Sequence, residues 1–182
     1  MLSRGPSGVR LRPVIVIVAG VAGSGKSTVG TMLASELGWP FADGDAFHSA
    51  AALAKMRSGV PLTDEDRAPW LLGCKEWMNE TMDAGESGVL ACSALKRRYR
   101  ETLLLGCPSA TIVFLEVSRE VLAHRLHNRA SHFFPVKLMK SQLDLVEPPE
   151  PGERVQTVNA EGDPAQTVSK IIALLWPDGC PT

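Results

Sequence analysis

A glycine-rich segment, G-V-A-G-S-G-K-S at residues 20–27, constrains the fold of this 182-residue chain more than any other feature. It directly follows an apolar run rich in β-branched residues, Val14–Ala19, which predicts a central parallel strand buried on both faces. After it, Lys26–Leu37 shows the apolar spacing of a helix and ends at Gly38, a typical residue after a helix C-terminus. A strand, a glycine-rich loop and a helix are therefore predicted in this order.

This order is that of a phosphate-binding loop. The glycines let successive backbone N–H groups converge on phosphates, while Lys26 reaches the β and γ oxygens and the hydroxyl of Ser27 ligates Mg²⁺. We therefore expect a nucleoside triphosphate site, with ATP as phosphoryl donor; a structural glycine turn is the alternative. The predicted nucleotide contacts are Gly20, Val21, Ala22, Gly23, Ser24, Gly25, Lys26, Ser27 and Thr28.

Strand and helix patterns alternate along the rest of the chain. This alternation predicts an α/β fold with three layers, in which a five-stranded parallel sheet carries helices on both faces and ligands bind at the carboxyl ends of the strands. Further strands are expected at 40–43, 89–92, 111–117 and 154–158, and further helices at 47–57, from Thr63 and Asp66 through Met78, at 94–105, 118–127, up to Leu145 and at 165–175.

Composition favours a small-molecule partner. The net charge of −1 gives no electrostatic reason to expect nucleic acid or an anionic membrane, and no apolar stretch reaches the roughly 20 residues that span a bilayer. The four cysteines lack C-x-x-C spacing, which favours reduced thiols over a zinc site or a disulfide framework. We expect a cytoplasmic protein with a flexible leader at 1–12 and a single domain at 13–182.

Two aspartates follow the second predicted strand. Asp43 and Asp45 belong to D-G-D, and in a parallel sheet they lie across from the phosphate loop. One carboxylate suits hydrated Mg²⁺, for which Asp43 is our candidate, and the other suits the proton of a substrate hydroxyl. The alternative is that both aspartates only cap the following helix.

One arginine precedes a predicted lid at about 128–136, and another lies at its start. Arg125 and Arg129 are four residues apart and so share one helix face, directed toward S-H-F-F. A lid arginine neutralises charge on a phosphoryl group in transfer, although arginines at this spacing are often merely solvated.

Basic residues also follow the third predicted strand. Lys96, Arg97, Arg98 and Arg100 lie near the same sheet edge, where cations can hold an anionic acceptor, although a basic helix face explains at least two of them. Arg67 faces the acceptor or pairs with Asp64 or Asp66. His48 contacts substrate or packs against a helix.

Taken together, five segments strongly resemble the gluconate kinase family, and the similarity runs from about Val14 to the C-terminal helix. The acceptor-side segments D-x-D-R-x-P-W-L and C-S-A-L-K-x-x-Y-R discriminate more than the phosphate loop does. The five segments are G-V-A-G-S-G-K-S, D-G-D-A-F-H, K-M-R-S-G-V-P-L-T-D-E-D-R-A-P-W, C-S-A-L-K-R-R-Y-R and H-F-F.

The resemblance implies a nucleoside-kinase-like fold related to shikimate kinase, a mobile lid and a homodimer. It implies transfer of the ATP γ-phosphoryl group to the 6-hydroxyl of D-gluconate, with Asp45 as base and Arg125 and Arg129 as lid arginines. The carboxylate and hydroxyls of gluconate need cationic and polar partners. We expect these to come from His48, Arg67, Lys96 and Arg100, together with Asp45.

Two rival functions stay open at this stage. A kinase acting on shikimate or another sugar acid has the same fold and donor site, so only the acceptor segments separate it from a gluconate kinase. A nucleotide-controlled switch needs no acceptor site at all. The chain has no N-K-x-D motif for reading guanine.

Overall fold

Strand β1 (Ile15–Ala19) lies at the centre of a five-stranded parallel sheet, and all five of its residues are buried. The computed structural model describes residues 12–127 and 142–179. The strand order is β2-β3-β1-β4-β5, with every neighbouring pair parallel, so all carboxyl ends lie at one edge. The other strands are β2 (Phe41–Asp43), β3 (Gly88–Ala91), β4 (Ala110–Glu116) and β5 (Val155–Asn159).

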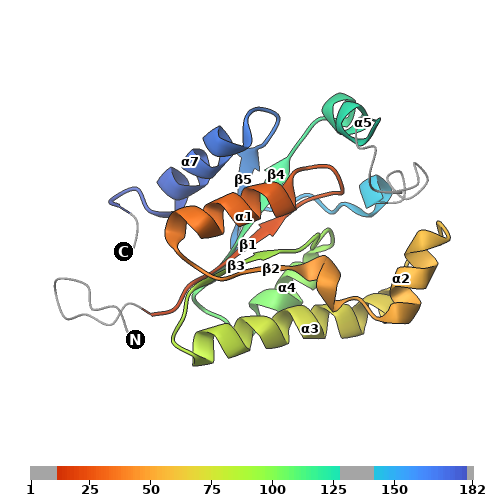
Figure 1. The fold of residues 1–182 in the computed structure, drawn as a ribbon, viewed down its shortest axis with the longest axis horizontal. Coiled ribbons are helices and arrows are strands. Elements are labelled where there is room, and N and C mark those ends of the chain that lie inside the picture. Colours follow the sequence, from red (N-terminus) through yellow and green to blue (C-terminus); the bar gives the residue numbers. More distant parts are fainter. Residues whose placement is uncertain (1–11, 128–141, 180–182) are drawn as a thin grey trace.

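Helices cover both faces of the sheet, as Figure 1 shows. Helices α1 (Lys26–Leu37) and α7 (Pro164–Leu175) lie on one face, and α3 (Asp64–Asp83) and α4 (Arg97–Leu104) lie on the other. The predicted three-layer α/β fold with a five-stranded parallel sheet is confirmed. The remaining elements are the 3-10 helix η1 (Gly44–Phe47), α2 (Ala50–Arg57), α5 (Arg119–His127) and a helical segment at 142–145.

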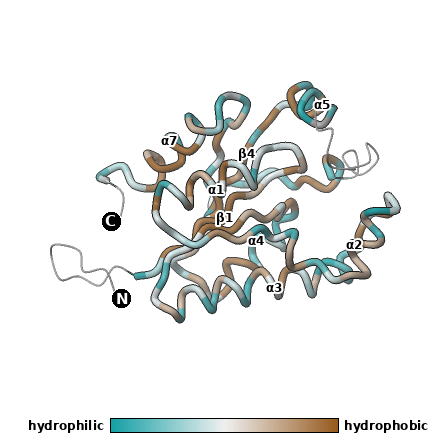
Figure 2. Tube along the Cα trace, viewed as in Figure 1, coloured by the Kyte–Doolittle hydropathy of each residue, from teal (hydrophilic) through white to brown (hydrophobic). Residues whose placement is uncertain are grey.

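The core consists of two apolar clusters, one on each face of the sheet. Alternate residues of β1 supply both: Ile15 and Ile17 point toward α3 and α4, whereas Val16 and Val18 point toward α1 and α7. Figure 2 shows the hydrophobic stretches gathered on the central strands β1 and β4. Because β1 is buried on both faces, its carboxyl end is a fixed support for the loop that follows.

Most helix boundaries follow the sequence signals. Helix α1 ends at Gly38, which adopts the left-handed φ of 68°, and α3 begins with the predicted capping box of Thr63 and Asp66. Two expected helices are shorter than predicted. The helix expected at 47–57 is divided, because Ser49 caps α2, and the one expected at 94–105 starts only at Arg97.

Several expectations fall outside the described residues. Arg129 and the predicted lid at 128–136 lie there, as does the predicted leader apart from its last residue. Within the described part of the chain, no helix is long and apolar enough to cross a membrane.

A buried ion pair joins α4 to the segment before β5. Arg100 is 1% exposed, and its Nε and Nη2 donate to the two carboxylate oxygens of Glu153 at 2.8 and 3.0 Å. Its Nη1 also donates to the main-chain carbonyls of Leu95 and Glu147 at 3.2 and 2.9 Å. The hydrogen bonds from Arg100 to the Glu153 carboxylate lower the pKa of that carboxyl below its usual value of 4.5. Arg100 therefore anchors the segment from Glu147 to Glu153.

Replacing this arginine should destabilise the protein strongly. Removing one partner of a buried pair leaves an uncompensated charge, so Arg100→Met should lower the free energy of unfolding by about 3–5 kcal/mol in urea titrations. Since the folded-state pKa of Glu153 is depressed, the pair stabilises at neutral pH and this contribution is lost as the pH falls through that pKa. The acid-dependent loss of stability should accordingly shrink in the variant.

Arg97 provides the matched control. It lies on the same helix, its side chain is 50% exposed, and its partners Glu101 and Glu150 are exposed as well. Arg97→Met should change stability little, because ion pairs at the surface are screened by water and salt. Equal destabilisation by the two variants would contradict the structural role assigned to Arg100.

Candidate functional site

The loop after β1 has the backbone geometry of an anion-binding loop. Gly20, Gly23 and Gly25 adopt φ values of 139°, 84° and 100°, which side chains of L-residues rarely tolerate. Gly25 also provides the N-terminal cap of α1 without a side-chain hydrogen bond. The N–H groups of the first turn of α1 are thereby left for an anion, and the helix dipole favours negative charge there.

Two side chains of this loop, Lys26 and Ser27, make hydrogen bonds within the protein. The ammonium of Lys26 donates to the carbonyl oxygen of Val21 at 3.0 Å, and the hydroxyl of Ser27 donates to Oδ2 of Asp43 at 2.5 Å. Asp43 also accepts from the backbone N–H of Asp45 at 3.0 Å. The structure therefore brings together the phosphate loop and the D-G-D segment after β2, as expected from a parallel sheet.

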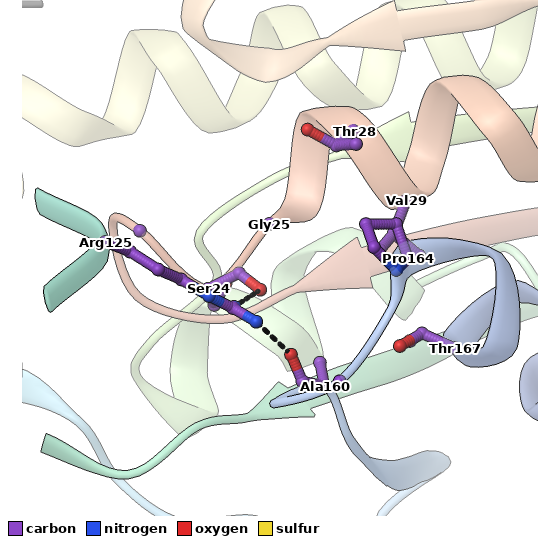
Figure 3. A pocket seen from close by; sticks show the side chains of 10 residues that line it. Ser24, Gly25, Thr28, Val29, Arg125, Ala160, Pro164 and Thr167 are labelled. Atoms are coloured by element: carbon purple, nitrogen blue, oxygen red, sulfur yellow. Dashed lines mark hydrogen bonds between the residues drawn. The ribbon is translucent and has the colours of Figure 1, made fainter. Parts of the chain in front are cut away.

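A cavity of about 290 Å³ lies on the other side of the loop. Figure 3 shows Thr28 and Val29 of α1 facing Ala160, Pro164 and Thr167 from the end of β5 and the start of α7. No sequence motif predicts a function for the residues after β5. The signal that points to them is their position past the carboxyl end of a strand, next to the predicted phosphate loop.

Arg125 closes one side of this cavity. Its guanidinium donates to the carbonyl oxygens of Ser24 at 3.2 Å, Ala160 at 2.8 Å and Glu161 at 3.0 Å, and Figure 3 shows it extending between the phosphate loop and Ala160. These contacts fix the two walls of the cavity relative to each other.

His48 follows the last residue of η1, the short helix that begins directly after Asp43. Its ring stacks on Trp70 with centroids 4.9 Å apart and an interplanar angle of 6°, and Trp70 is fixed by its own indole N–H, which donates to Gly44 at 2.8 Å. Nδ1 of His48 is buried and has no hydrogen-bond partner within the described residues. The packing of His48 on a helix is therefore confirmed, and its contact with substrate stays a prediction, for which the unpartnered Nδ1 is a polar atom to be explained.

Burial lowers the pKa of His48 below its ordinary value of 6.5. The nearby carboxylate of Asp45 opposes this shift by favouring the protonated ring, and the guanidinium of Arg67 adds to it. His48 is therefore neutral at neutral pH, with one ring nitrogen as donor and the other as acceptor.

Asp64, at the start of α3, is the centre of a cation cluster that consists of Arg67, Lys96 and Arg98 around Tyr99. Its carboxylate accepts from Lys96 at 3.1 Å, from Arg98 and from the hydroxyl of Tyr99. Arg67 and Lys96 also lie over the Tyr99 ring, 6.0 and 5.7 Å from its centroid. Lys96 and Arg98 share the Asp64 carboxylate, and Arg67 adds a third positive charge over the Tyr99 ring, so this surface retains positive charge for an anion.

The structure places the predicted acceptor residues Arg67 and Lys96 together in the cation cluster. Asp66, which the sequence offered as an ion-pair partner of Arg67, pairs with Lys55 at 2.6 Å. The assignment of Arg100 to the acceptor site is wrong, because its side chain is buried and paired with Glu153. Spacing placed Arg100 on the basic helix but could not tell that it faces inward. Asp64 and Tyr99 were not predicted as site residues.

The site offers two oxygen donors for a cation. Asp43 and Ser27 are hard ligands next to the phosphate loop, and Mg²⁺ is commonly held by one or two protein oxygens together with phosphates and water. Among residues 12–127 and 142–179, no group of three or more His, Cys, Asp or Glu side chains is arranged to hold a metal. The donor set therefore fits a metal that arrives with a nucleotide.

The two charges beside His48 give signed predictions for its titration. In NMR titrations of the histidine ring protons, assigned with a His48→Gln variant, the pKa of His48 should lie below 6.5. Asp45→Asn should lower it further, and Arg67→Met should raise it, since each removes the charge that acts in the opposite direction. Shifts of the reverse sign would contradict the arrangement.

Comparisons with known proteins agree with this geometry. The shikimate kinase family profile matches residues 22–146. A gluconokinase of Gluconobacter oxydans is 46% identical over 162 residues, which cover 89% of this chain and 91% of that protein. The chain is also similar to two crystal structures: a sugar kinase of a Janibacter species (TM-score 0.83, 44% identity, 91% and 95% coverage) and a gluconokinase of Sinorhizobium meliloti (TM-score 0.80, 38% identity, 92% and 99% coverage).

The family expected from the sequence is therefore confirmed at the levels of sequence and fold. The chain is a kinase with a shikimate kinase family domain, and it belongs to the gluconokinase family.

Proposed function

We propose that this protein transfers the γ-phosphoryl group of ATP to the 6-hydroxyl of D-gluconate, giving ADP and 6-phosphogluconate. The observation that carries the proposal is a pair of hydrogen bonds to Asp43, one from Ser27 of the phosphate loop and one from the backbone N–H of Asp45. An acceptor held by His48 and the cation cluster would therefore lie beside the nucleotide phosphates. In-line transfer requires such proximity.

The donor half consists of the cavity, the phosphate loop and Lys26. We assign the base and ribose of ATP to the cavity between α1 and the start of α7, and the phosphates to the N-terminus of α1. Lys26 then exchanges its contact with Val21 for the β and γ oxygens. Because Arg125 already donates to three carbonyls, we assign it mainly to holding the nucleotide cavity, with a contribution to the phosphoryl charge. Arg129 keeps its predicted role as lid arginine.

Ser27 and Asp43 would hold the magnesium ion, Ser27 directly and Asp43 directly or through water. When bound with ATP, Mg²⁺ neutralises charge that develops on the phosphate oxygens. Because the hydroxyl of Ser27 donates its hydrogen to Asp43, its oxygen lone pairs would be left for the metal. The short hydrogen bond between the two side chains thus holds both ligands in place before the metal enters.

On the acceptor side, Asp45 is the proposed base. It is exposed at the start of η1, next to Asp43, and accepts the proton of the 6-hydroxyl while the new O–P bond forms and the bond to the β-phosphate oxygen breaks. Arg67 and Lys96 of the cation cluster pair with the carboxylate of gluconate, and neutral His48 hydrogen-bonds a sugar hydroxyl.

The cation cluster argues against a nucleotide-controlled switch, since such a protein needs no anionic acceptor site. It does not by itself separate gluconate from shikimate or another sugar acid, because all of them carry a carboxylate. A kinase for another small acid is therefore the second candidate.

A substrate panel tests the assignment directly. The purified protein should phosphorylate D-gluconate with ATP only when Mg²⁺ is present, measured as ADP release and as formation of 6-phosphogluconate. Shikimate and other sugar acids should react far more slowly. If ADP forms with another acid of the panel but not with gluconate, the substrate assignment is wrong; if it forms with none, the reaction class is wrong.

The base assignment predicts a separation of binding from turnover. Asp45→Asn keeps the size of the side chain but removes the proton acceptor, so kcat should fall by roughly 10²–10⁴-fold. ATP affinity, measured by calorimetry, should change little because Asp45 does not touch the phosphate loop in the described contacts. Asp83→Asn, at the far end of α3, is a matched control and should leave kcat unchanged.

The proposal extends to a homodimer in the cytoplasm. The resemblance to gluconate kinases supports the dimer, and the free thiols of Cys74, Cys92 and Cys107 are consistent with a reducing compartment. Light scattering of the purified protein decides the oligomeric state.

A further inference from the structure

A glutamine far along the chain touches the phosphate loop. The backbone N–H of Ala22 donates to Oε1 of Gln142 at 2.8 Å, across 120 residues of sequence. Since an N–H can only donate, the contacting atom of the carboxamide is its carbonyl oxygen, and the two donors of the NH₂ group of Gln142 are not used by Ala22. Gln142 is half-buried and lies in the helical segment 142–145.

The segment that carries Gln142 is held firmly. Leu143 and Val146 pack against the core cluster on the α3 and α4 face. The N–H of Glu147 donates to the carbonyl of Leu95 at 2.9 Å, and its carboxylate accepts from the N–H of Arg97 at 2.7 Å. Gln142 is thus supported on one side by the core and by α4, and on the other by the phosphate loop. Support of this kind fixes a polar group within a functional site.

The part of the loop that Gln142 contacts does not line the nucleotide cavity. Gly23, Ser24 and Gly25 line the nucleotide cavity, whereas Ala22, which directly precedes them, is not one of its lining residues. Lys26, which is to reach the β and γ oxygens, now donates to the carbonyl of Val21, the residue before Ala22. The carboxamide therefore lies where the γ-phosphoryl group approaches the loop rather than where the base binds.

From these contacts we infer that Gln142 acts on the phosphoryl group in transfer. Ala22 fixes the carboxamide through Oε1, and its NH₂ group donates a hydrogen bond to an oxygen of the γ-phosphoryl group as the charge on that oxygen develops. A neutral donor suits this place, because Lys26 and Mg²⁺ already supply positive charge. The inference rests on the proposed phosphoryl transfer and adds a catalytic residue to it.

Two substitutions separate the donor from mere support of the loop. Gln142→Glu keeps an oxygen for the N–H of Ala22 but replaces the NH₂ donors by a carboxylate, and Gln142→Met removes both functions at similar length. With gluconate and ATP, kcat should fall by about 10²-fold in Gln142→Met, the usual loss for one transition-state donor. It should fall at least as far in Gln142→Glu, because the carboxylate repels the phosphates.

A pH profile adds a readout that a structural role does not move. Protonation of the carboxyl in Gln142→Glu restores one donor, so the ratio of its kcat to that of the wild type should rise as the pH is lowered toward 5. The same ratio for Gln142→Met should stay flat. Gln156→Met, an exposed glutamine on β5, is the matched control and should keep the wild-type kcat.

The outcomes distinguish this inference from the function on which it rests. Absence of gluconate turnover in the wild type contradicts the proposed function. If the wild type turns over gluconate normally, two results overturn the donor role of Gln142. One is an unchanged kcat in Gln142→Met. The other is a wild-type kcat in Gln142→Glu together with a loss of kcat in Gln142→Met. Thermal unfolding and calorimetric ATP binding of each variant establish that it is folded; should Gln142→Met be unfolded, the level and pH dependence of kcat in Gln142→Glu decide alone.

Discussion

The hydrogen bond between Ser27 and Asp43 is the contact on which the two halves of the site depend. It joins the first turn of α1 to the end of β2, although β3 lies between β1 and β2 in the sheet. The contact is possible because every strand is parallel and all carboxyl ends meet at one edge. A shift of α1 or η1 would therefore move the nucleotide phosphates away from the acceptor. The buried strand β1 limits such a shift by fixing where α1 begins.

Local sequence signals were enough for the fold and for the donor loop. Each of Lys26, Ser27 and Gly25 has its role because of neighbours within a few residues, and the apolar pattern of β1 is equally local. The family could be named from the sequence because the acceptor segments are long and specific. Contacts between distant residues could not be predicted in this way. The pairing of Arg100 with Glu153 spans 53 residues, and that of Ala22 with Gln142 spans 120.

Electrostatic roles were also only partly predictable. A run of basic residues on α4 indicated an anion site, but the helix period alone did not say which of Lys96, Arg98 and Arg100 face outward. Burial decides this question, because a buried guanidinium requires a buried carboxylate, and Glu153 supplies it. On the outer face, Asp64 holds Lys96 and Arg98, and its single negative charge does not neutralise both of them. Aspartate at the start of α3 is in addition favoured by the helix dipole.

The wrongly assigned arginine still matters for the proposed reaction, through what it supports. Arg100 binds the carbonyls of Leu95 and Glu147, so it fixes the residue before Lys96 and the segment that carries Gln142 at the same time. A buried ion pair adds little net stability compared with an apolar core, because both charges must be desolvated. Its advantage here is geometric: the planar guanidinium ties the start of α4 to both ends of the segment from Glu147 to Glu153 with directed hydrogen bonds. One interior residue thereby aligns a cation of the acceptor side with the glutamine beside the phosphate loop.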